Sequence, residues 1–464
     1  MNSSLYSLSP LDGRYKEQTK ELRRYFSEFA LMQSRARVEV AYLIALAEEE
    51  DVQGLSPFSL EEQRELCRVY EEFSEADAER IKEIEKTIRH DGKAVELFLC
   101  EKYEGLPCMK DKLSFIHFGL TSEDVTNCAY GILINQSLRE IVIPTLENFL
   151  CLQNKAQQWK EVKLLSLTHG QPATPTTVGK EMLVYVERLE RQLRQLQQFR
   201  MQGKFGGAVG NFAAHRIAYP PLPSPPLPAP RSLGVVGREG SREGVDWPEF
   251  GRKFVESLGL IPLRYTTQIN PHDDLAELSH MLQRINTILI DFSRDMWMYI
   301  SRGVFCQKLV EGEVGSSTMP HKVNPIDFEN AEGNLGLSNA LFQHFAEKLP
   351  VSRMQRDLSD STVQRSIGSA FGYHALAMTS LTKGLGRIAV DEEVCRRELQ
   401  KHPEVWAEAV QTLLRRRCVP QAYDMIKKAT RGRTVTHEIM EEIMQETGVH
   451  EDDVQRVREA MGSG

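Results

Sequence analysis

The sequence predicts an all-α protein with a central bundle of long helices, and three observations lead to this fold class. Apolar residues recur at alternating spacings of three and four from Leu275 to Tyr299, which is the repeat of one helix face. A second apolar stripe runs from Met182 to Leu196, with charged residues around the rest of that helix. No series of β-branched runs alternates at period two, as strands would require.

The stripe over 275–300 is the strongest of these signals. A helix of that length would extend about 39 Å, which suits a bundle core. Shorter, charge-rich helical patterns follow Ser366, interrupted by Pro403 and Pro420. The other segments that we expect to be helical are 26–50, 59–89, 124–160, 178–200 and 328–349.

The length of 464 residues corresponds to roughly three domains at about 150 residues each. We predict an N-terminal helical domain over 1–111, a central long-helix domain over 112–365 and a C-terminal helical domain over 366–464. The central domain would carry the bundle.

Composition excludes several function classes. With Lys+Arg 57 and Asp+Glu 65, the net charge is −8, so no global positive field favours nucleic acid or an anionic membrane as a partner. No apolar window approaches the roughly 20 residues that span a bilayer, and the N-terminus lacks a signal or transit pattern, so we expect a cytoplasmic protein. The 8 cysteines are scattered without a C-x-x-C spacing, and we expect no metal site, no disulfide framework and no cofactor.

One segment departs from the globular pattern. Pro220–Pro230 holds seven of the 21 prolines and is followed by a Gly/Arg/Ser stretch to Gly244. We expect a polyproline II or disordered surface excursion. The alternative is a docking site for an SH3-like domain, and we assign the segment no chemistry.

Three segments contain residues that could carry chemistry. Residues 312–325, rich in turn formers and hydroxyls with one lysine, are expected to form a mobile loop, and composition alone favours plain turn chemistry over a functional role. Residues 167–177 are expected to form an irregular segment before the 178–200 helix, with His169 near its start. His169 could be structural, and Thr176 or Thr177 a helix cap. Thr121 and Asp124 fit a capping box, which alone would explain both.

The first of these segments resembles a known signature. Residues 315–325, Gly-Ser-Ser-Thr-Met-Pro-His-Lys-Val-Asn-Pro, are similar to the signature loop of the fumarase/aspartase superfamily. Within it the chain resembles the bacterial-type adenylosuccinate lyase family over about residues 5–450. The matching segments are 9–15, 90–91, 121–124, 168–175 and 348–363. The resemblance implies a three-domain helical fold and a homotetramer that assembles each active site from three subunits.

The resemblance implies a small-molecule purine nucleotide substrate. Adenylosuccinate would be cleaved to AMP and fumarate, and the succinyl-carboxamide ribotide (SAICAR) to its carboxamide ribotide (AICAR) and fumarate. Such an elimination needs a base for the Cβ proton, an acid for the leaving nitrogen and donors for the aci-carboxylate. By similarity Ser316 is the base and His169 the acid, while His90 orients the acid or the substrate phosphate.

The same resemblance assigns the binding residues. Lys322 and Asn324 would hold the succinyl carboxylates, with Thr121 and Ser122 donating hydrogen bonds to the same moiety. The remaining residues expected at the phosphate, ribose and rest of the substrate are Arg14, Tyr15, Arg89, Asp91, Gln268, Val323, Asn330, Arg356, Ser361, Thr362, Val363, Gln364 and Arg365.

The chain departs from the family pattern at three positions or segments. Arg89 stands where we expect Asn before His90, and Gly92 stands where Val is usual. Residues 221–244 form an insertion of 244 − 221 + 1 = 24 residues. One expectation is a tolerated surface loop, because loop-closure entropy grows slowly with length. The alternative is that the insertion hinders subunit packing.

Two alternative functions are open at this point. Another superfamily lyase, such as argininosuccinate lyase or fumarase, is disfavoured by Arg356 in the 348–365 segment, which suits a phosphate. A non-catalytic helical scaffold would be expected to have lost Ser316, His169 or Lys322, and all three are present.

Overall fold

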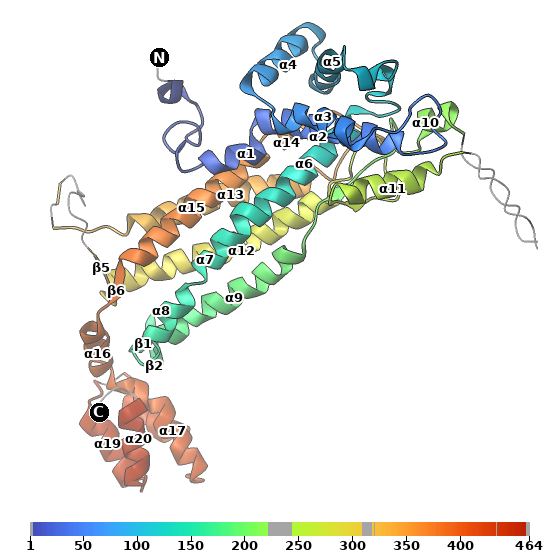
Figure 1. Ribbon diagram of the computed structural model, residues 1–464. Coiled ribbons are helices and arrows are strands. Elements are labelled where there is room, and N and C mark those ends of the chain that lie inside the picture. The colour runs from blue at the N-terminus through green and yellow to red at the C-terminus, as the bar shows by residue number, and fades with distance from the viewer. Residues whose placement is uncertain (1–2, 221–243, 309–317, 320, 433, 461–464) are drawn as a thin grey trace, which may run out of the picture. The chain divides into compact units, whose positions relative to one another are not determined.

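The two apolar stripes form the long helices that they predict: α12 spans Asp273–Ser301 and α9 spans Val178–Gln198 (Figure 1). The structure is a computed structural model, and it describes residues 3–220, 244–308, 318–319, 321–432 and 434–460. Helices dominate the described chain, so the all-α prediction is confirmed. The insertion predicted over 221–244, except Gly244, and residues 312–317 and 320 of the predicted loop lie outside the described residues.

The chain divides into two compact units, each made of three chain segments. Unit 1 comprises Met1–Pro144, Arg194–Asn286 and Gly336–Leu376, and unit 2 comprises Thr145–Leu193, Thr287–Leu335 and Ala377–Gly464. The three domains predicted from the sequence follow different boundaries and stay a prediction.

Unit 1 contains most of the shorter helices of the first half of the chain. Its α-helices are α1 (Arg23–Phe26), α2 (Glu28–Ala47), α3 (Leu60–Glu71), α4 (Glu75–Ile88), α5 (Asp91–Tyr103), α6 (Ser122–Ser137), α10 (Ala213–Ala218), α11 (Trp247–Ser257) and α14 (Ser359–Gln364). Short 3₁₀ turns are η1 (Ser3–Tyr6), η2 (Lys20–Leu22), η3 (Pro107–Met109) and η4 (Leu113–Phe115).

Unit 2 contains α8 (Leu152–Gln158), α16 (Glu392–Gln400), η6 (Pro403–Trp406), α17 (Ala407–Arg416), α18 (Ala422–Thr430), α19 (His437–Glu446) and α20 (Glu451–Ala460). The helix α7 (Ile143–Phe149) begins in unit 1 and continues into unit 2. Four longer helices also have residues in both units: α9, α12, α13 (Ile326–Lys348) and α15 (Ile367–Arg387).

The helix expected over 124–160 is interrupted, and proline explains the first irregularity. A π-helical turn, η5 (Leu138–Val142), follows α6, and Pro144 is the second residue of the next helix, α7 (Ile143–Phe149). Proline lacks an N–H, and its ring clashes with the carbonyl four residues earlier, so the wider turn accommodates it. The helix expected over 59–89 is likewise two helices, because Ser74 starts α4 with a capping box to Asp77.

Three short two-stranded sheets accompany the helices. β1 (Lys163–Thr168) pairs antiparallel with β2 (Gln171–Thr177), β3 (Gln202–Gly203) pairs parallel with β4 (Ile261–Pro262), and β5 (Phe305–Gln307) pairs antiparallel with β6 (Ile388–Val390). The expectation that 167–177 is irregular was therefore wrong. These residues belong to a hairpin, and Thr177 caps α9 by accepting a hydrogen bond from Lys180 N at 3.1 Å.

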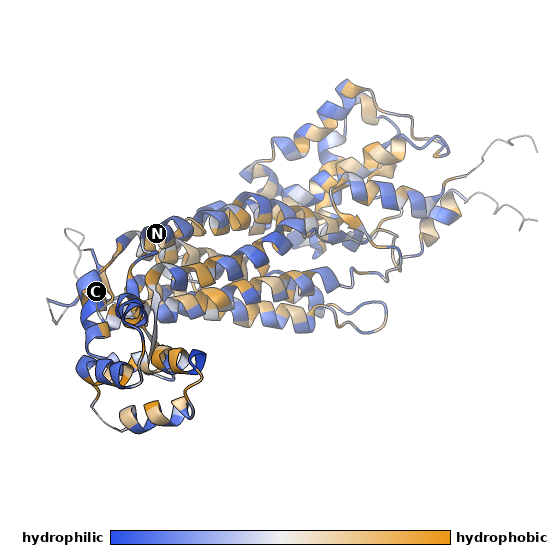
Figure 2. Ribbon diagram, turned by 90° about the horizontal axis from the view of Figure 1, so that it is seen from below, coloured by the Kyte–Doolittle hydropathy of each residue, from blue (hydrophilic) through white to orange (hydrophobic). Residues whose placement is uncertain are grey.

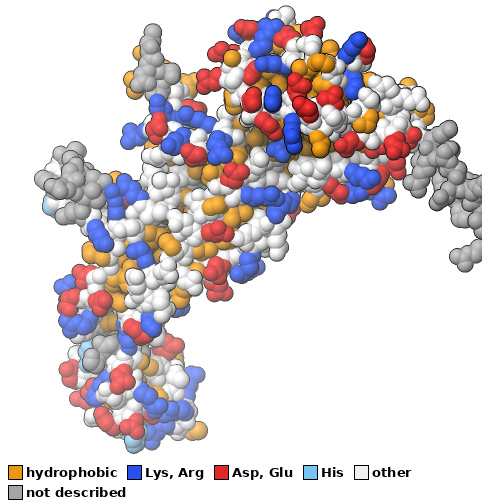
Figure 3. Space-filling view, viewed as in Figure 1, with side chains coloured by type: hydrophobic (Ala, Val, Ile, Leu, Met, Phe, Trp, Pro, Cys, Tyr) orange, Lys and Arg blue, Asp and Glu red, His pale blue; other side chains and the backbone are white. Residues whose placement is uncertain are grey.

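Amphipathic helices build the interior of each unit. Figure 2 shows hydrophobic and hydrophilic residues on the same helices, and the face drawn in Figure 3 intersperses Lys and Arg with Asp and Glu. The C-terminal helices of unit 2 close around Trp406, which is 1% exposed. Among the described helices, none combines the length and the apolar character needed to cross a bilayer.

A buried polar chain links three long helices within unit 1. His374 Nδ1 lies 2.7 Å from Oδ1 of the Asn286 side chain. The Nδ2 of the same amide donates a hydrogen bond to Ser338 Oγ at 3.1 Å. The Ser338 hydroxyl in turn donates to the Ala370 carbonyl at 2.9 Å. The chain ties α12, α13 and α15 together through side chains that water does not reach.

The first turn of α6 is held by an ion pair without solvent contact. Lys204 Nζ lies 2.6 Å from Asp124 Oδ1, and both side chains are 0% exposed. The same carboxylate accepts from the N–H groups of Gly206, Gly207 and Thr121 at 2.9, 3.0 and 2.9 Å. The bond from Thr121 is one half of the predicted capping box. A buried charge pair is tolerated only when such additional hydrogen bonds satisfy it.

We predict that Lys204→Met destabilises the protein by about 3–5 kcal/mol, because the substitution leaves Asp124 buried and unpaired. The measurement is the free energy of unfolding in urea at a fixed protein concentration. The matched control is Lys82→Met, which removes ion pairs with the exposed Glu28 and the half-buried Glu85 and should cost about 1 kcal/mol or less per pair. Equal losses in the two variants would contradict the prediction.

We also predict a pH dependence of stability from His374. Burial lowers its pKa to about 4, whereas the unfolded chain has a value of about 6.5. Above about pH 7.5 both states are almost entirely neutral, so His374 adds almost no pH dependence there. As the pH falls from 6.5 to 4, the unfolded state binds a proton that the native state does not, and stability decreases.

At pH 5 this loss should reach about 2 kcal/mol relative to pH 8. The free energy of unfolding of the wild type and of His374→Gln, which retains a group able to bond to Asn286, should therefore diverge between pH 5 and pH 8. Parallel pH profiles for the two proteins would show that His374 does not titrate in this way.

Candidate functional site

A cavity of about 510 Å³ in unit 1 gathers most of the predicted site residues of that unit. The predicted residues that line it are Arg89, His90, Asp91, Thr121, Ser122, Gln268, Arg356, Ser361, Gln364 and Arg365. They come from the α4–α5 junction, the start of α6, the segment before α12, and α14 with its flanks. Sequence positions as far apart as 89 and 365 therefore meet at one place.

The α4–α5 junction presents two cationic or donor groups to this cavity. Arg89 ends α4 in the left-handed conformation, with φ 57°, and His90 caps α5 by accepting a hydrogen bond from Lys93 N at Nδ1, at 3.1 Å. Because Nδ1 is an acceptor, a neutral His90 carries its proton on Nε2 and can donate it to a ligand. The left-handed region is uncommon for residues other than Gly, Asn and Asp, so Arg89 holds an unfavourable backbone conformation here.

Asp91 organises two arginines of the cavity. Its Oδ2 accepts from Arg35 Nη1 at 3.0 Å and from Arg365 Nη2 at 3.2 Å, and its Oδ1 accepts from Gly92 N at 2.9 Å. Burial alone would raise the pKa of Asp91, but Arg35, the Gly92 N–H and Arg365 lower it to about 2. Asp91 is therefore a carboxylate at neutral pH that holds guanidinium groups for a ligand.

Gly92 permits a close approach of the two helix starts. A Cβ on Gly92 would lie 3.1 Å from the Cβ and Oγ of Ser122. A larger side chain would require Ser122 at the first turn of α6 to shift. This contact gives Gly92, the second departure from the family pattern, a local structural reason.

Arg356 crosses the other side of the cavity. Its Nη1 donates to Gln268 Oε1 at 3.2 Å, and its Nη2 lies 3.8 Å from Glu123 Oε2. The Arg356 Nε is buried without a hydrogen-bond partner among the described residues. Four arginines, Arg35, Arg89, Arg356 and Arg365, line the cavity together with the carboxylates of Glu85, Asp91 and Glu123. Arginine forks match the geometry of phosphate.

A group of three buried side chains beside the cavity has the spacing of metal ligands. Ligand atoms of Glu123, His272 and Asp360 lie within 4.8 Å of one another. However, Gln364 Nε2 donates to His272 Nε2 at 2.8 Å, and the Arg356 guanidinium supplies positive charge at Glu123. We therefore interpret the group as part of an ion and hydrogen-bond network rather than as a metal site.

Some predicted residues of unit 1 do not line this cavity. Arg14 and Tyr15 lie together, with the guanidinium 5.8 Å from the Tyr15 ring centroid. Thr362 and Val363 belong to α14 between lining residues. The cavity also contains residues that the sequence interpretation missed: Arg35, Glu85, Glu123, Thr126, Tyr130 and Leu358.

The other predicted residues belong to unit 2. His169 forms the tip of the β1–β2 hairpin, where Thr168 pairs with Gln171. Positive φ values of 53° at His169 and 71° at Gly170 are what a two-residue turn of this handedness requires. The imidazole is exposed at this tip rather than near a helix start, as we expected from the sequence.

Near α13, Lys322 and Val323 are exposed, and Gln307 Nε2 donates to the Val323 carbonyl at 2.8 Å. Asn324 is half-buried just before the helix. Asn330 lies on α13, where its Oδ1 accepts from Ser380 Oγ at 2.8 Å. Ser316 lies outside the described residues.

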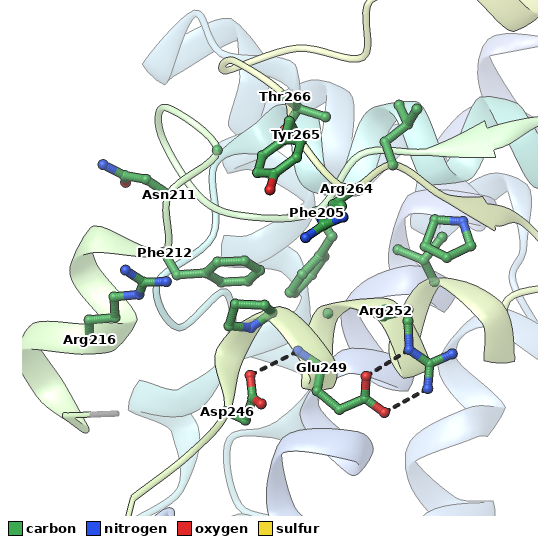
Figure 4. Close-up of a pocket in the computed structure, with 16 residues that line it drawn as sticks. Phe205, Asn211, Phe212, Arg216, Asp246, Glu249, Arg252, Arg264, Tyr265 and Thr266 are labelled. Atoms are coloured by element: carbon green, nitrogen blue, oxygen red, sulfur yellow. Dashed lines mark hydrogen bonds and ion pairs between the residues drawn. The ribbon is translucent and has the colours of Figure 1, made fainter. Parts of the chain in front are cut away.

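A larger cavity of about 640 Å³ lies elsewhere in unit 1 and contains none of the predicted residues. Figure 4 shows Phe205 and Phe212 inside it and charged side chains around them. Its Glu249 and Arg252 already pair with each other at 2.6 Å, and Asp246 accepts from Glu249 N at 3.2 Å. Cavity size alone would therefore select a site without the predicted acid, base or phosphate-binding groups.

Comparisons with known proteins match nearly the whole chain. Residues 13–222 and 240–337 match the family described as Lyase, and residues 352–462 match the family described as Adenylosuccinate lyase C-terminal. The adenylosuccinate lyase of Haemophilus influenzae is 44% identical over 457 residues, which are 98% of this chain and 95% of that protein. The adenylosuccinate lyase of Escherichia coli strain K12 is 45% identical with the same coverage.

A eukaryotic relative and two solved structures extend the comparison. The adenylosuccinate lyase of Dictyostelium discoideum is 46% identical over 436 residues, or 92% of this chain and 89% of that protein. The 3-carboxy-cis,cis-muconate lactonizing enzyme of Pseudomonas putida has a TM-score of 0.73 at 19% identity, covering 96% of this chain and 94% of that one. A fumarate lyase of Mesorhizobium sp. BNC1 has the same TM-score and coverage at 16% identity, so these two share the fold.

We predict that inorganic phosphate binds the 510 Å³ cavity through its arginines. Arg365→Gln should weaken phosphate binding about tenfold or more, because a hydrogen bond to a charged group contributes about 1.5–3 kcal/mol. The measurement is the phosphate-dependent rise in melting temperature, supported by calorimetric titration. Arg252→Gln in the larger cavity is the matched control, and an equal loss in that variant would contradict the assignment.

Proposed function

Since this chain belongs to the adenylosuccinate lyase family, we propose that it cleaves adenylosuccinate to AMP and fumarate, and SAICAR to AICAR and fumarate. The observation that carries this proposal is identity of 44% and 45% to adenylosuccinate lyases over 98% of the chain. The four arginines of the 510 Å³ cavity support it, because the substrates carry a phosphate.

The proposed reaction is a β-elimination of a C–N bond. A base removes the Cβ proton of the succinyl group, and its electron pair becomes the new C=C bond of fumarate as the C–N bond breaks. The nitrogen keeps the electrons of the broken bond and receives a proton from an acid. Before the C–N bond breaks, the aci-carboxylate concentrates negative charge that nearby donors must stabilise.

We propose Ser316 as the base and His169 as the acid. A serine hydroxyl is a weak base, so its loop must bring donors that stabilise the alkoxide and must exclude water. Lys322 and Asn324, which follow Ser316 in the same signature segment, are proposed to hold the succinyl carboxylates with Thr121 and Ser122. The exposed turn at His169 supports its proposed role, because a tip residue can reach a ligand.

His90 and the arginines are proposed to bind the nucleotide end of the substrate. The Nε2–H of His90 and the guanidinium groups of Arg356 and Arg365 offer donors to the phosphate. Arg89 adds a cation that the family pattern lacks at this position. Tighter phosphate binding than in relatives with Asn there is the expected effect of this residue.

We propose a homotetramer in which each active site takes residues from three subunits, and a cytoplasmic enzyme. This proposal rests on the similarity to adenylosuccinate lyases over nearly the whole chain. The non-catalytic scaffold is the second candidate, and a direct assay separates the two.

We predict that the purified protein releases fumarate and AMP from adenylosuccinate, followed by absorbance and chromatography. Ser316→Ala and His169→Ala should each lower kcat by at least about 100-fold, the range of general acid–base catalysis. The matched controls are Ser317→Ala, at the neighbouring serine, and His344→Ala, at an exposed histidine of α13.

Oligomer size and circular dichroism confirm that each variant is folded. Absence of fumarate with a folded, assembled wild type would favour the scaffold instead. Full activity in Ser316→Ala or His169→Ala would remove that residue from its proposed role, while leaving the lyase activity in place.

A further inference from the structure

Glu123 is a buried carboxyl group that the proposed acid, base and binding roles do not use. It is the second residue of α6, directly after Ser122, and its side chain lines the 510 Å³ cavity. Glu123 is 4% exposed, and its Oε1 has no hydrogen-bond partner among the described residues. Burying an ionised carboxylate without full hydrogen bonding is costly, so this position requires a compensating interaction.

The charged or titratable groups that face Glu123 come from every element packed around it. They are His272 from the segment before α12, Arg356 and Asp360 from α14 and the segment before it, Lys204 from the segment after β3, and Asp124 and Tyr130 from α6 itself. Lys204 is already committed to Asp124. His272 accepts from the Gln364 amide. Arg356 is the guanidinium group that faces Glu123, next to the imidazole of His272.

Glu123 and Arg356 are close enough to form an ion pair but too far apart for a hydrogen bond. The Arg356 Nη2 lies 3.8 Å from Glu123 Oε2, which is longer than a hydrogen bond. The Arg356 guanidinium is anchored to Gln268 through Nη1, and its Nε has no hydrogen-bond partner among the described residues. The Arg356 guanidinium therefore has one hydrogen bond to a neutral amide and faces the carboxylates of Glu123 and Asp360 without a hydrogen bond to either, so it has donors left for an anion.

An anion and the Glu123 carboxylate would compete for the same guanidinium. If the phosphate of a nucleotide binds Arg356, an ionised Glu123 lies close to a second negative group in a buried site, and like charges there repel strongly. Protonation of Glu123 removes this repulsion and leaves Arg356 to the phosphate. The proton comes from solvent and returns to it when the nucleotide leaves.

We propose that Glu123 is a positioning residue that takes up a proton when a nucleotide phosphate binds Arg356, and so couples nucleotide affinity to pH. The inference rests on the proposed function, because it takes the nucleotide as the ligand of this cavity. Glu123 does not touch the reacting atoms and acts through Arg356.

The ionisation of Glu123 is suited to this coupling. Burial raises the pKa of Glu123 to about 7, although His272 and Arg356 favour its ionised form. Both protonation states are therefore populated in the unliganded protein near neutral pH. Neutralisation of Arg356 by a phosphate raises this pKa further, so binding takes up protons, and affinity falls as the pH rises above 7.

The test is calorimetric titration of the full-length protein with AMP between pH 7.5 and 9, in buffers of different ionisation enthalpy. The AMP phosphate has its second pKa at about 6, so it stays dianionic and adds no protons in this range. The wild type should take up as much as one proton per AMP bound, and its Kd should rise with a slope of as much as tenfold per pH unit. Glu123→Gln should show no proton uptake and a Kd independent of pH.

Glu61→Gln is the matched control, because Glu61 is the second residue of α3, another helix that starts with a capping box, and is exposed. It should behave as the wild type does. Circular dichroism and oligomer size establish that Glu123→Gln is folded. A structural role alone would weaken AMP binding equally at every pH, whereas the positioning role predicts the largest difference at pH 9.

Two further outcomes separate this inference from the proposed function. Fumarate release by the wild type, with equal proton uptake in the wild type and Glu123→Gln, overturns the inference and leaves the lyase activity standing. If the assembled wild type neither binds AMP nor releases fumarate, the proposed function fails, and the inference fails with it.

Discussion

The ion pair between Lys204 and Asp124 is the constraint on which the cavity geometry depends. One carboxylate without solvent contact receives the lysine and the N–H groups of Thr121, Gly206 and Gly207. The start of α6 is thereby fixed to the segment after β3. Thr121, Ser122 and Glu123 directly precede Asp124 at this fixed helix start. The ion pair therefore sets their positions at the cavity, although neither Asp124 nor Lys204 lines it.

A second carboxylate performs a comparable task at the cavity surface. Asp91 separates Arg35 from Arg365 and holds both in fixed directions. Without Asp91, mutual repulsion would drive the two guanidinium groups apart before any ligand arrived. An anion therefore meets arginines that are already ordered, which lowers the entropy lost on binding. A net charge of −8 is compatible with the proposed anion-binding cavity, because the arginines are concentrated there and Asp91 holds Arg35 and Arg365 in place.

Much of the fold follows directly from sequence pattern, and some of the site does not. The stripes at 182–196 and 275–299 and the Thr121–Asp124 spacing predict α9, α12 and the start of α6, because each is a local rule. The β1–β2 hairpin was missed because its two-residue turn uses His169 with Gly170, rather than the usual Asn-Gly or Asp-Gly.

Glu123 and Arg35 were missed for another reason. Glu123 interacts with Arg356, and Arg35 interacts with Asp91, and each pair is far apart in the sequence. A local sequence pattern does not show which distant residue pairs with a buried charge. The helix α2 carries two buried charged residues one turn apart, Arg35 and Glu39, and this spacing is a signal that could have drawn attention. The resemblance to a family predicted more site residues than the spacing of residues in the sequence alone could predict.

The division of each unit into three chain segments bears on how the protein forms during synthesis. Unit 1 needs residues up to Leu376, and unit 2 begins at Thr145 and needs the C-terminal helices. Neither unit can be completed while the ribosome still holds the second half of the chain. Until then the apolar faces of α6 and α9 stay without their later partners and are exposed to aggregation.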